Sequence, residues 1–233
     1  TKYDPGSDAV IKNRSYNDLL KMNHVSMTGV VDSDFYYSHE TAGEAFYTCY
    51  VRVYRYSRNS DRIPVLVSER SVDINKDLTG KIVGLTGQLR SYKVTKENTR
   101  RLLHIVFADN IHVMDDPDIT DITQNEVVLD GYLCTKPVFR VTPHGREISD
   151  FLLSVCRNFN KSDLIPCICW GRNARFASMM EKGLRIKIAG RLQERMYNKK
   201  LDDGMIIQRT VYEVSINRIR YRLGKNAVSL GPV

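Results

Sequence analysis

The sequence predicts an all-β protein built from two tandem five-stranded barrels. Two observations support this fold class. The chain of 233 residues repeats itself at a spacing of 102 to 103 residues, so its two halves resemble each other. Each half also contains short runs of β-branched and aromatic residues with a period of two, which is the pattern of half-buried strands.

Three separated blocks of the sequence carry the repeat, in the same order in both halves. The matched blocks are "NHVSMTGVV" at 23–31 with "NEVVLDGYL" at 125–133, "SDRIP" at 60–64 with "SDLIP" at 162–166, and "TGKIVGLTGQL" at 79–89 with "KGLRIKIAGRL" at 182–192. Agreement over three blocks at nearly one spacing indicates an internal duplication.

The duplication predicts how the chain is divided. We expect a diverged first domain at residues 23–114 and a second domain at residues 125–222. The segment "MDDPDITDIT" is rich in aspartate, so residues 115–124 are expected to be an acidic linker. Residues 1–22 would then form an N-terminal extension, and residues 223–233 a C-terminal tail.

Five predicted strands follow one another in the second repeat. They are "EVVLDGYLC", "ISDFLLSVCR", "LIPCICWG", "LRIKIAGRL" and "TVYEVSINRI". Between the third and fourth, "RNARFASMMEKG" has apolar residues at helical spacing and ends in Gly183, which predicts a short helix. The first repeat has "SERSVDINKDLTG" there, where no regular helix is expected. This order of elements is that of the OB-fold, a small Greek-key barrel that commonly binds oligonucleotides.

The charge of the chain indicates a polyanionic partner. The net charge is +8. Residues 123–233 contain 19 basic and 10 acidic side chains, whereas residues 1–122 contain 16 and 17. Within the first half, residues 46–101 are again basic, with 12 basic and 5 acidic side chains. Two basic bodies suggest nucleic acid, and a basic surface that only maintains solubility is the alternative.

Other features of the sequence do not indicate an enzyme, a cofactor or a metal site. The five cysteines lack paired CxxC spacing, so buried reduced thiols are expected instead of zinc ligands. The five histidines are scattered, and no phosphate loop or nucleophile motif occurs. No apolar run is long enough to span a membrane and no secretory signal is present, so a cytoplasmic location is expected.

The second repeat resembles the bacterial single-stranded DNA-binding protein (SSB) family over residues 125–219. The motif residues are Gly131, Leu133, Pro137, Arg140, Pro143 and Gly145, followed by "CWGRNARFASMMEKGLRIKIAGRLQER". The first repeat looks like a copy that lacks the Pro-Val-x-Arg segment. Two domains in one chain resemble the tandem OB-fold members of this family.

The resemblance implies positions for three base-stacking aromatic residues. These are Phe159 after strand two, Trp170 at the end of strand three, and Tyr197 in the hairpin after strand four. Trp170 alternates with Cys167 and Cys169 along its strand, so the cysteines should face the barrel interior and the indole the outer groove.

Interleaved aromatic and cationic residues support the same function without the family. A single strand exposes flat bases and a charged backbone, so its binder needs π surfaces beside cations. Further candidates are Phe139, Arg140, Arg157, Arg172, Arg175, Arg195, Lys199 and Lys200 in the second repeat, and Tyr54, Arg55, Tyr56, Tyr92 and Lys93 in the first. In contrast, Phe107, Phe151 and Phe176 are expected in the barrel cores.

We therefore expect a non-catalytic protein that binds single-stranded DNA largely without sequence preference, in replication, recombination or repair. The resemblance also implies a homodimer, because the family usually presents four OB domains together, and replication or recombination proteins as partners. Two alternatives stay open: a primosome-type or RNA-binding OB protein, and an adaptor that uses its OB-folds for protein contacts.

Overall fold

The computed structural model describes residues 22–96, 99–118, 122–157, 161–200, 204–223 and 226–230. These residues form two compact units. The first-repeat unit combines Val25–Val127 with Arg191–Ser215, and the second-repeat unit combines Val128–Gly190 with the described residues of Thr1–His24 and Ile216–Val233. Part of a hairpin that begins in the second repeat therefore belongs to the first-repeat unit.

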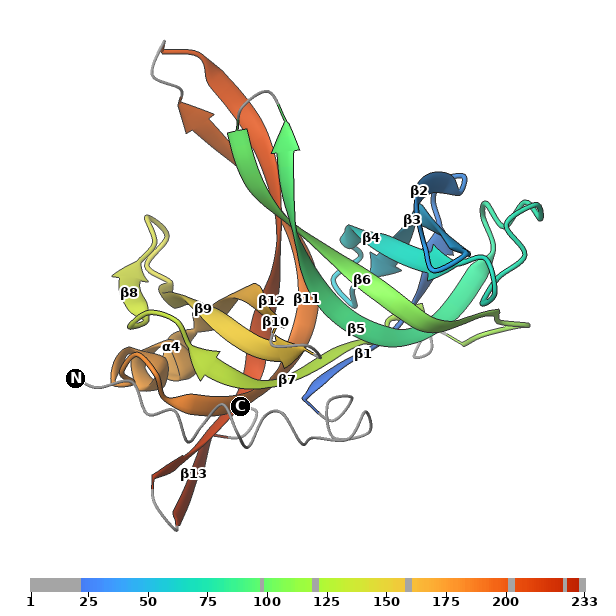
Figure 1. The fold of residues 1–233 in the computed structure, drawn as a ribbon. Helices are drawn as coiled ribbons and strands as arrows, with labels where there is room; N and C mark the ends of the chain where they lie inside the picture. The colour runs from blue at the N-terminus through green and yellow to red at the C-terminus, as the bar shows by residue number, and fades with distance from the viewer. Residues whose placement is uncertain are drawn as a thin grey trace. The chain divides into compact units, whose positions relative to one another are not determined.

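The first repeat forms a closed barrel of five strands with one added strand (Figure 1). Its strands are β1 (Asn23–Val31), β2 (Tyr36–Thr41), β3 (Glu44–Tyr54), β4 (Ser60–Ser68), β5 (Ile82–Lys96) and β6 (Thr99–Val113). Strand β1 pairs antiparallel with both β3 and β5, which closes the barrel. Strands β4 and β6 are parallel neighbours, and β2 adds a hairpin to β3. This is the strand order of an OB-fold.

The second repeat has the same strand order and adds a helix. Its elements are β7 (Asn125–Leu133), β8 (Val138–Val141), β9 (Glu147–Arg157), β10 (Lys161–Trp170), α4 (Gly171–Ser178), β11 (Arg185–Lys200), β12 (Ile206–Leu223) and β13 (Asn226–Leu230). Strand β7 neighbours both β9 and β11, and β12 lies between β11 and β10. The prediction of an all-β chain with two OB barrels is confirmed.

Alternating apolar residues build both cores, as the period of two predicts. Val51 and Val53 of β3 are fully buried, while the residue between them is not. Val155 of β9 is also fully buried, whereas its two neighbours in the strand are not. A glycine repeats where each barrel closes. A Cβ on Gly29 would come within 2.5 Å of the Arg52 carbonyl oxygen. A Cβ on Gly131 would come within 2.3 Å of the Ser154 carbonyl oxygen. Only glycine lets these strands approach so closely.

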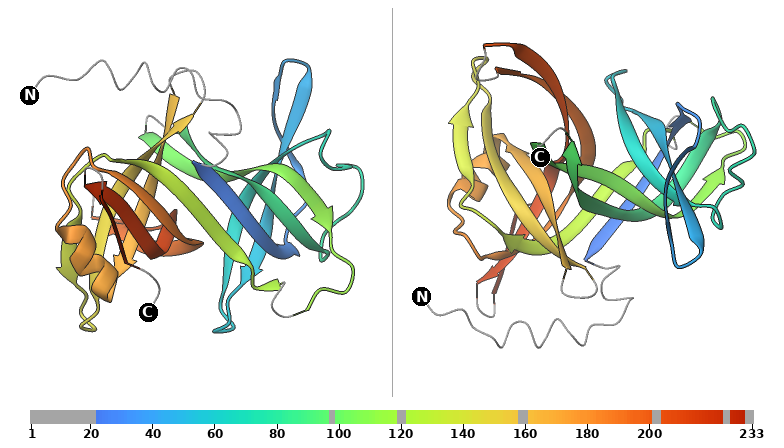
Figure 2. Two further views of the ribbon diagram at one scale, coloured as in Figure 1. Left: turned by 90° about the horizontal axis from the view of Figure 1, so that it is seen from below. Right: turned by 45° about the horizontal axis from the view of Figure 1, so that its top comes forward.

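Helix α4 lies between strands three and four of the second repeat, as predicted, and packs against β8, β9 and β10 (Figure 2). The helix buries Ala174 and Ala177 completely. It ends at Ser178, earlier than the apolar spacing indicates, and Gly183 then adopts a φ of 86° in the following turn. In the first repeat, the described residues 69–81 form turns without a helix.

Three short strands were not expected from the sequence. All residues of β2 and β8 are exposed, so neither strand has the alternation of apolar and polar residues that reveals a half-buried strand. Strand β13 lies within the predicted C-terminal tail and pairs antiparallel with β12. Strands β11 and β12 also extend well beyond their predicted apolar segments, into a long hairpin.

Candidate nucleic-acid interface

Trp170 ends β10 on the outer surface of the second-repeat unit. Its side chain is 38% exposed, whereas Cys167 and Cys169 are buried in the barrel. Burial raises the pKa of the Cys169 thiol to about 12. Gly171 has a φ of 51°, a conformation that side chains rarely adopt, and turns the chain sharply from β10 into α4. This turn leaves the indole beside the start of the helix, away from the core.

The indole of Trp170 borders an open hollow of about 630 Å³. The hollow is lined by Val141, Gly145, Arg146, Glu147, Trp170, Gly171 and Arg175. Arg146 is exposed and was not among the predicted site residues. Arg146 directly follows the Pro-x-Gly turn, and this position in the sequence could have identified it as a site residue. A flat ring beside two guanidinium groups can hold a base and its phosphate.

An ion pair lies within this hollow. The Arg175 Nε donates to Glu147 Oε2 at 2.6 Å. This hydrogen bond and the Glu147 charge raise the pKa of Arg175 above its ordinary value. Arg175 is 70% exposed, so a phosphate can reach it, but a phosphate there must compete with the carboxylate.

The β8–β9–β10 register places Arg140 on the same face as Trp170. Both residues are paired with Ile148 of β9, one from each side. Two strand spacings separate them, or about 10 Å. Arg140 also donates to Asp150 at 2.7 and 2.9 Å, and its neighbour Phe139 is 40% exposed. An arginine and a tryptophan thus share one outer face of the sheet.

Two of the residues predicted to contact phosphate form ion pairs with buried carboxylates. Arg157 donates through Nε to Asp163 at 2.9 Å, and Arg55 makes the same contact with Asp61 at 2.9 Å. Each carboxylate is nearly inaccessible, with 2% and 1% of its side chain exposed. The hydrogen bond that Arg55 donates to Asp61 raises the pKa of Arg55. These two guanidinium groups support their barrels, and their charges are largely compensated.

The β11–β12 hairpin carries predicted residues of the second repeat that belong to the first-repeat unit. Tyr197 is 40% exposed, and the Arg195 guanidinium lies 5.6 Å from the centroid of its ring. Arg195 also makes two hydrogen bonds of 2.9 Å to the buried Glu213. Lys199 and Lys200 end β11, just beyond Tyr197. Arg195 and Tyr197 thus place a cation beside an aromatic ring on this segment.

The first barrel places its four other predicted residues on two strands and a turn. Tyr54 ends β3 with 36% of its surface exposed, and Tyr56 in the following turn is 76% exposed. Lys93 is exposed in β5, whereas Tyr92 is half-buried. A cluster that sequence reasoning missed lies nearby: the Arg62 guanidinium is 3.8 Å from the ring centroid of Tyr50.

The remaining predictions have different outcomes. Arg172 is exposed in the first turn of α4, and Phe159 lies outside the described residues. Phe151 is buried in the core as predicted, with 5% exposure. Phe107 and Phe176 are only half-buried, and each contacts another aromatic ring. Their predicted core positions are therefore only partly correct.

Within the described part of the chain, no three histidine, cysteine or acidic side chains gather as metal ligands would. Among those same residues, no helix has both the length and the apolar character that a membrane crossing requires.

In each barrel the first strand pairs with the second and the fourth, and the third strand lies beside the fifth; two such barrels define a tandem OB-fold protein. The chain belongs to the single-strand binding protein family, whose sequence model matches residues 124–221. The single-stranded DNA-binding protein of Clostridium tetani is 38% identical over 114 residues, which are 46% of this chain and 76% of that protein. Single-stranded DNA-binding protein 3 of Clostridium acetobutylicum is 36% identical over 104 residues, 42% of this chain and 69% of that protein.

A solved structure resembles both repeats. The wild-type single-stranded DNA binding protein from Thermus aquaticus matches 89% of this chain and 96% of its own, with a TM-score of 0.66 and 18% sequence identity. At this identity the likeness concerns the fold alone. It extends to the first repeat, which lies outside the match to the family sequence model.

Proposed function

We propose that this chain is a non-catalytic protein that binds single-stranded DNA largely without sequence preference. It would protect and organise single strands during replication, recombination or repair. Bases stack on Trp170, Tyr197 and Phe139, while exposed arginines contact the phosphates. Stacking tolerates every base because each one has a π face, so little sequence preference is expected.

The single observation that carries this proposal is the environment of Trp170. Large aromatic side chains are usually buried, yet this ring is 38% exposed and borders a hollow with Arg146 and Arg175. Family membership supports the same ligand, because the relatives in Clostridium tetani and Clostridium acetobutylicum carry the name single-stranded DNA-binding protein.

The test is a comparison of three ligands at matched salt. Affinity should be highest for oligo-dT and much lower for duplex DNA, and weaker for RNA of the same length. Preference for RNA or forked DNA would instead favour an RNA-binding or primosome-type protein. Absence of binding to all three would favour an adaptor that uses its barrels for protein contacts.

We also propose that the chain forms a homodimer, which would bring four OB barrels together. Sedimentation at micromolar concentration should then give the mass of two chains, and a stable monomer would contradict the proposal. Replication or recombination proteins are the proposed further partners.

The two repeats are proposed to contribute unequally to binding. The second repeat has Trp170 and the exposed arginines of the hollow, and the chain from residue 123 onward has the excess of basic residues. The first barrel would bind more weakly. Replacing Tyr54 and Tyr56 by alanine should accordingly weaken oligo-dT binding less than Trp170→Ala does.

A further inference from the structure

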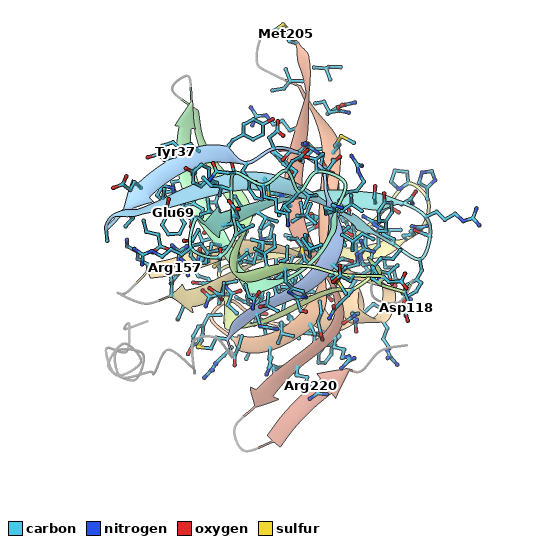
Figure 3. All side chains as sticks on the ribbon, turned by 90° about the vertical axis from the view of Figure 1, so that its right-hand side faces the viewer. Tyr37, Glu69, Asp118, Arg157, Met205 and Arg220 are labelled. Carbon is cyan, nitrogen blue, oxygen red and sulfur yellow. The ribbon has the colours of Figure 1, made fainter. Side chains whose placement is uncertain are left out.

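The distal part of the β11–β12 hairpin packs as part of the first-repeat unit, although its sequence follows the second repeat. Residues Arg191–Ser215 belong to that unit together with Val25–Val127. Figure 3 labels Met205, which is 59% exposed at the far end of this hairpin. The hairpin also carries Arg195 and Tyr197. An isolated two-stranded hairpin is only marginally stable in water, so the contacts at its base determine how these side chains are held.

Asp61 of β4 is the centre of these contacts. Its side chain is 1% exposed, so its charge needs several partners. It accepts hydrogen bonds from Arg55 and from the backbone amide of Glu194 at 3.0 Å, and Arg191 Nη2 also donates to it. Burial lowers the pKa of Arg191, while the Asp61 charge opposes that shift. One carboxylate of the first barrel thus binds two points of the hairpin.

Glu194 is held from a second side as well. Its Oε2 accepts a hydrogen bond of 3.1 Å from the backbone amide of Arg62. The Arg62 side chain lies over Tyr50, and the half-buried Tyr212 of β12 lies close to Glu194, Tyr50 and Arg62. Burial raises the pKa of Tyr212, and the nearby Glu194 carboxylate raises it further. Backbone and side chain of Glu194 therefore both attach to β4.

We propose that Asp61 and Glu194 are positioning residues for single-stranded DNA binding. They fix the hairpin on the first barrel, so that Arg195 and Tyr197, one and three residues beyond Glu194, are presented in a single orientation. The diverged first repeat then contributes to binding by holding a DNA-contacting segment of the second repeat. This inference rests on the proposed function, because Tyr197 must contact DNA for its orientation to affect affinity.

A double-mutant cycle on the full chain tests this role. Tyr197→Ala should weaken oligo-dT binding by about 5-fold to 150-fold in the wild-type background, the range for one stacked base. In the Glu194→Ala background, the same substitution should change the affinity by less than about two-fold, since the ring is no longer held. Glu194→Gln keeps an acceptor oxygen and should restore most of the Tyr197 effect. Glu40→Ala, at an exposed position of β2, is the matched control.

Hydrogen exchange supplies a readout that does not require DNA. In the wild type, the Glu194 amide should exchange as slowly as the amides of β3 and β4. Glu194→Ala should remove protection across residues 191–200, whereas Glu40→Ala should leave it unchanged. If Tyr197→Ala costs the same in both backgrounds, or if the wild-type Glu194 amide exchanges rapidly, the positioning role is wrong. If the wild type does not bind oligo-dT at all, the proposed function fails, and the exchange data still decide whether the anchor exists.

Discussion

At the end of its third strand, the second-repeat barrel presents a tryptophan and the first-repeat barrel a serine. Trp170 and Ser68 are 102 residues apart and occupy equivalent positions. Trp170 is 38% exposed, whereas Ser68 is 8% exposed and donates a hydrogen bond to Glu44. The ion pairs Arg55–Asp61 and Arg157–Asp163, in contrast, are the same in both barrels. The duplication kept what holds the barrel together, and the exposed surface diverged.

The outer faces of strands two and three differ in the same way. The first barrel has Tyr50, Arg52, Tyr54 and Arg62 where the second has Leu152, Ser154, Cys156 and Leu164. In the first-repeat unit this face contacts the hairpin, since Glu194 accepts a hydrogen bond from the Arg62 amide. Polar and aromatic residues on one barrel face thus need not bind a ligand, because they can also hold another segment of the chain.

Removing the arginine of the shared ion pair should have the largest effect on stability, and the effect should be larger in the second barrel. Arg157→Ala leaves Asp163 buried without its partner, so the free energy of unfolding should fall by about 3 kcal/mol, near the lower end for a broken buried pair. Arg55→Ala should cost less in the first-repeat unit, because Arg191 and the Glu194 amide still donate to Asp61. Urea denaturation measures both, and Arg172→Ala is the exposed control.

The same variants separate stability from DNA contact. The slope of log affinity against log salt should not change in Arg157→Ala, because this guanidinium does not face phosphate. Loss of a phosphate contact would reduce that slope by about 0.7. An Arg157→Ala variant of unchanged stability and reduced slope would return this residue to the DNA interface.

Removing Trp170, which has no aromatic counterpart at the same position of the first barrel, should weaken oligo-dT binding by an intermediate amount. Trp170→Ala should reduce oligo-dT affinity by about 1–3 kcal/mol, the range for one stacked base, with little change in salt slope. Trp170→Phe keeps a π face and should retain most of the affinity. Because the chain has one tryptophan, emission changes on adding oligo-dT report this residue alone. Unchanged emission with DNA bound would exclude stacking on Trp170.

Glu147 and Glu44 allow a finer comparison of the two barrels. They are the first residues of β9 and β3, but Glu147 pairs with Arg175 in the hollow, whereas Glu44 accepts a hydrogen bond from Ser68. Glu147→Gln removes a negative charge near the proposed phosphate path and frees Arg175. Affinity for oligo-dT should therefore rise slightly, because an exposed ion pair contributes little. Glu44→Gln should leave it unchanged, and equal gains in both variants would indicate a general charge effect.

The sequence predicted the fold well because the barrel strands are half-buried. Period-two alternation and the duplicated blocks reveal such strands, and the alternation with Cys167 and Cys169 correctly placed Trp170 on the outside. Strands β2 and β8 have no buried face, so no alternation could reveal them. The extension of β11 beyond its apolar segment depends on contacts with β4, which lies far away in sequence.

The candidate site was harder to predict because charge in a sequence does not reveal its partner. Arg157 and Arg172 look equally suited to a phosphate, yet Arg157 is bound to a buried carboxylate. A signal was present in the sequence. Arg55 and Arg157 each lie six residues before the aspartate of a duplicated "SD" block. Arginine and aspartate kept together in both copies indicate a shared structural contact, whereas a DNA contact should differ between copies of unequal function.

The smallest expected effect concerns acid and the first barrel alone. Arg62 and Arg52 donate to Asp32 at 2.8 and 2.6 Å, while the equivalent position in the second repeat is Cys134. Burial opposes ionisation of Asp32, but these two arginines lower its pKa below the ordinary 3.8. The stabilisation is therefore complete above about pH 4 and is lost as the pH falls through the lowered pKa.

Asp32→Asn should accordingly reduce the stability of the first-repeat unit by about 0.5 kcal/mol at pH 7, because the group is partly exposed. The difference from wild type should be smaller at pH 2, because Asp32 loses its charge as the pH falls through its lowered pKa. Thermal unfolding at both pH values measures it, and Asp34→Asn, at an exposed neighbouring position, is the control. A difference that persists unchanged at pH 2 would mean that Asp32 stabilises the barrel through packing and not through its charge.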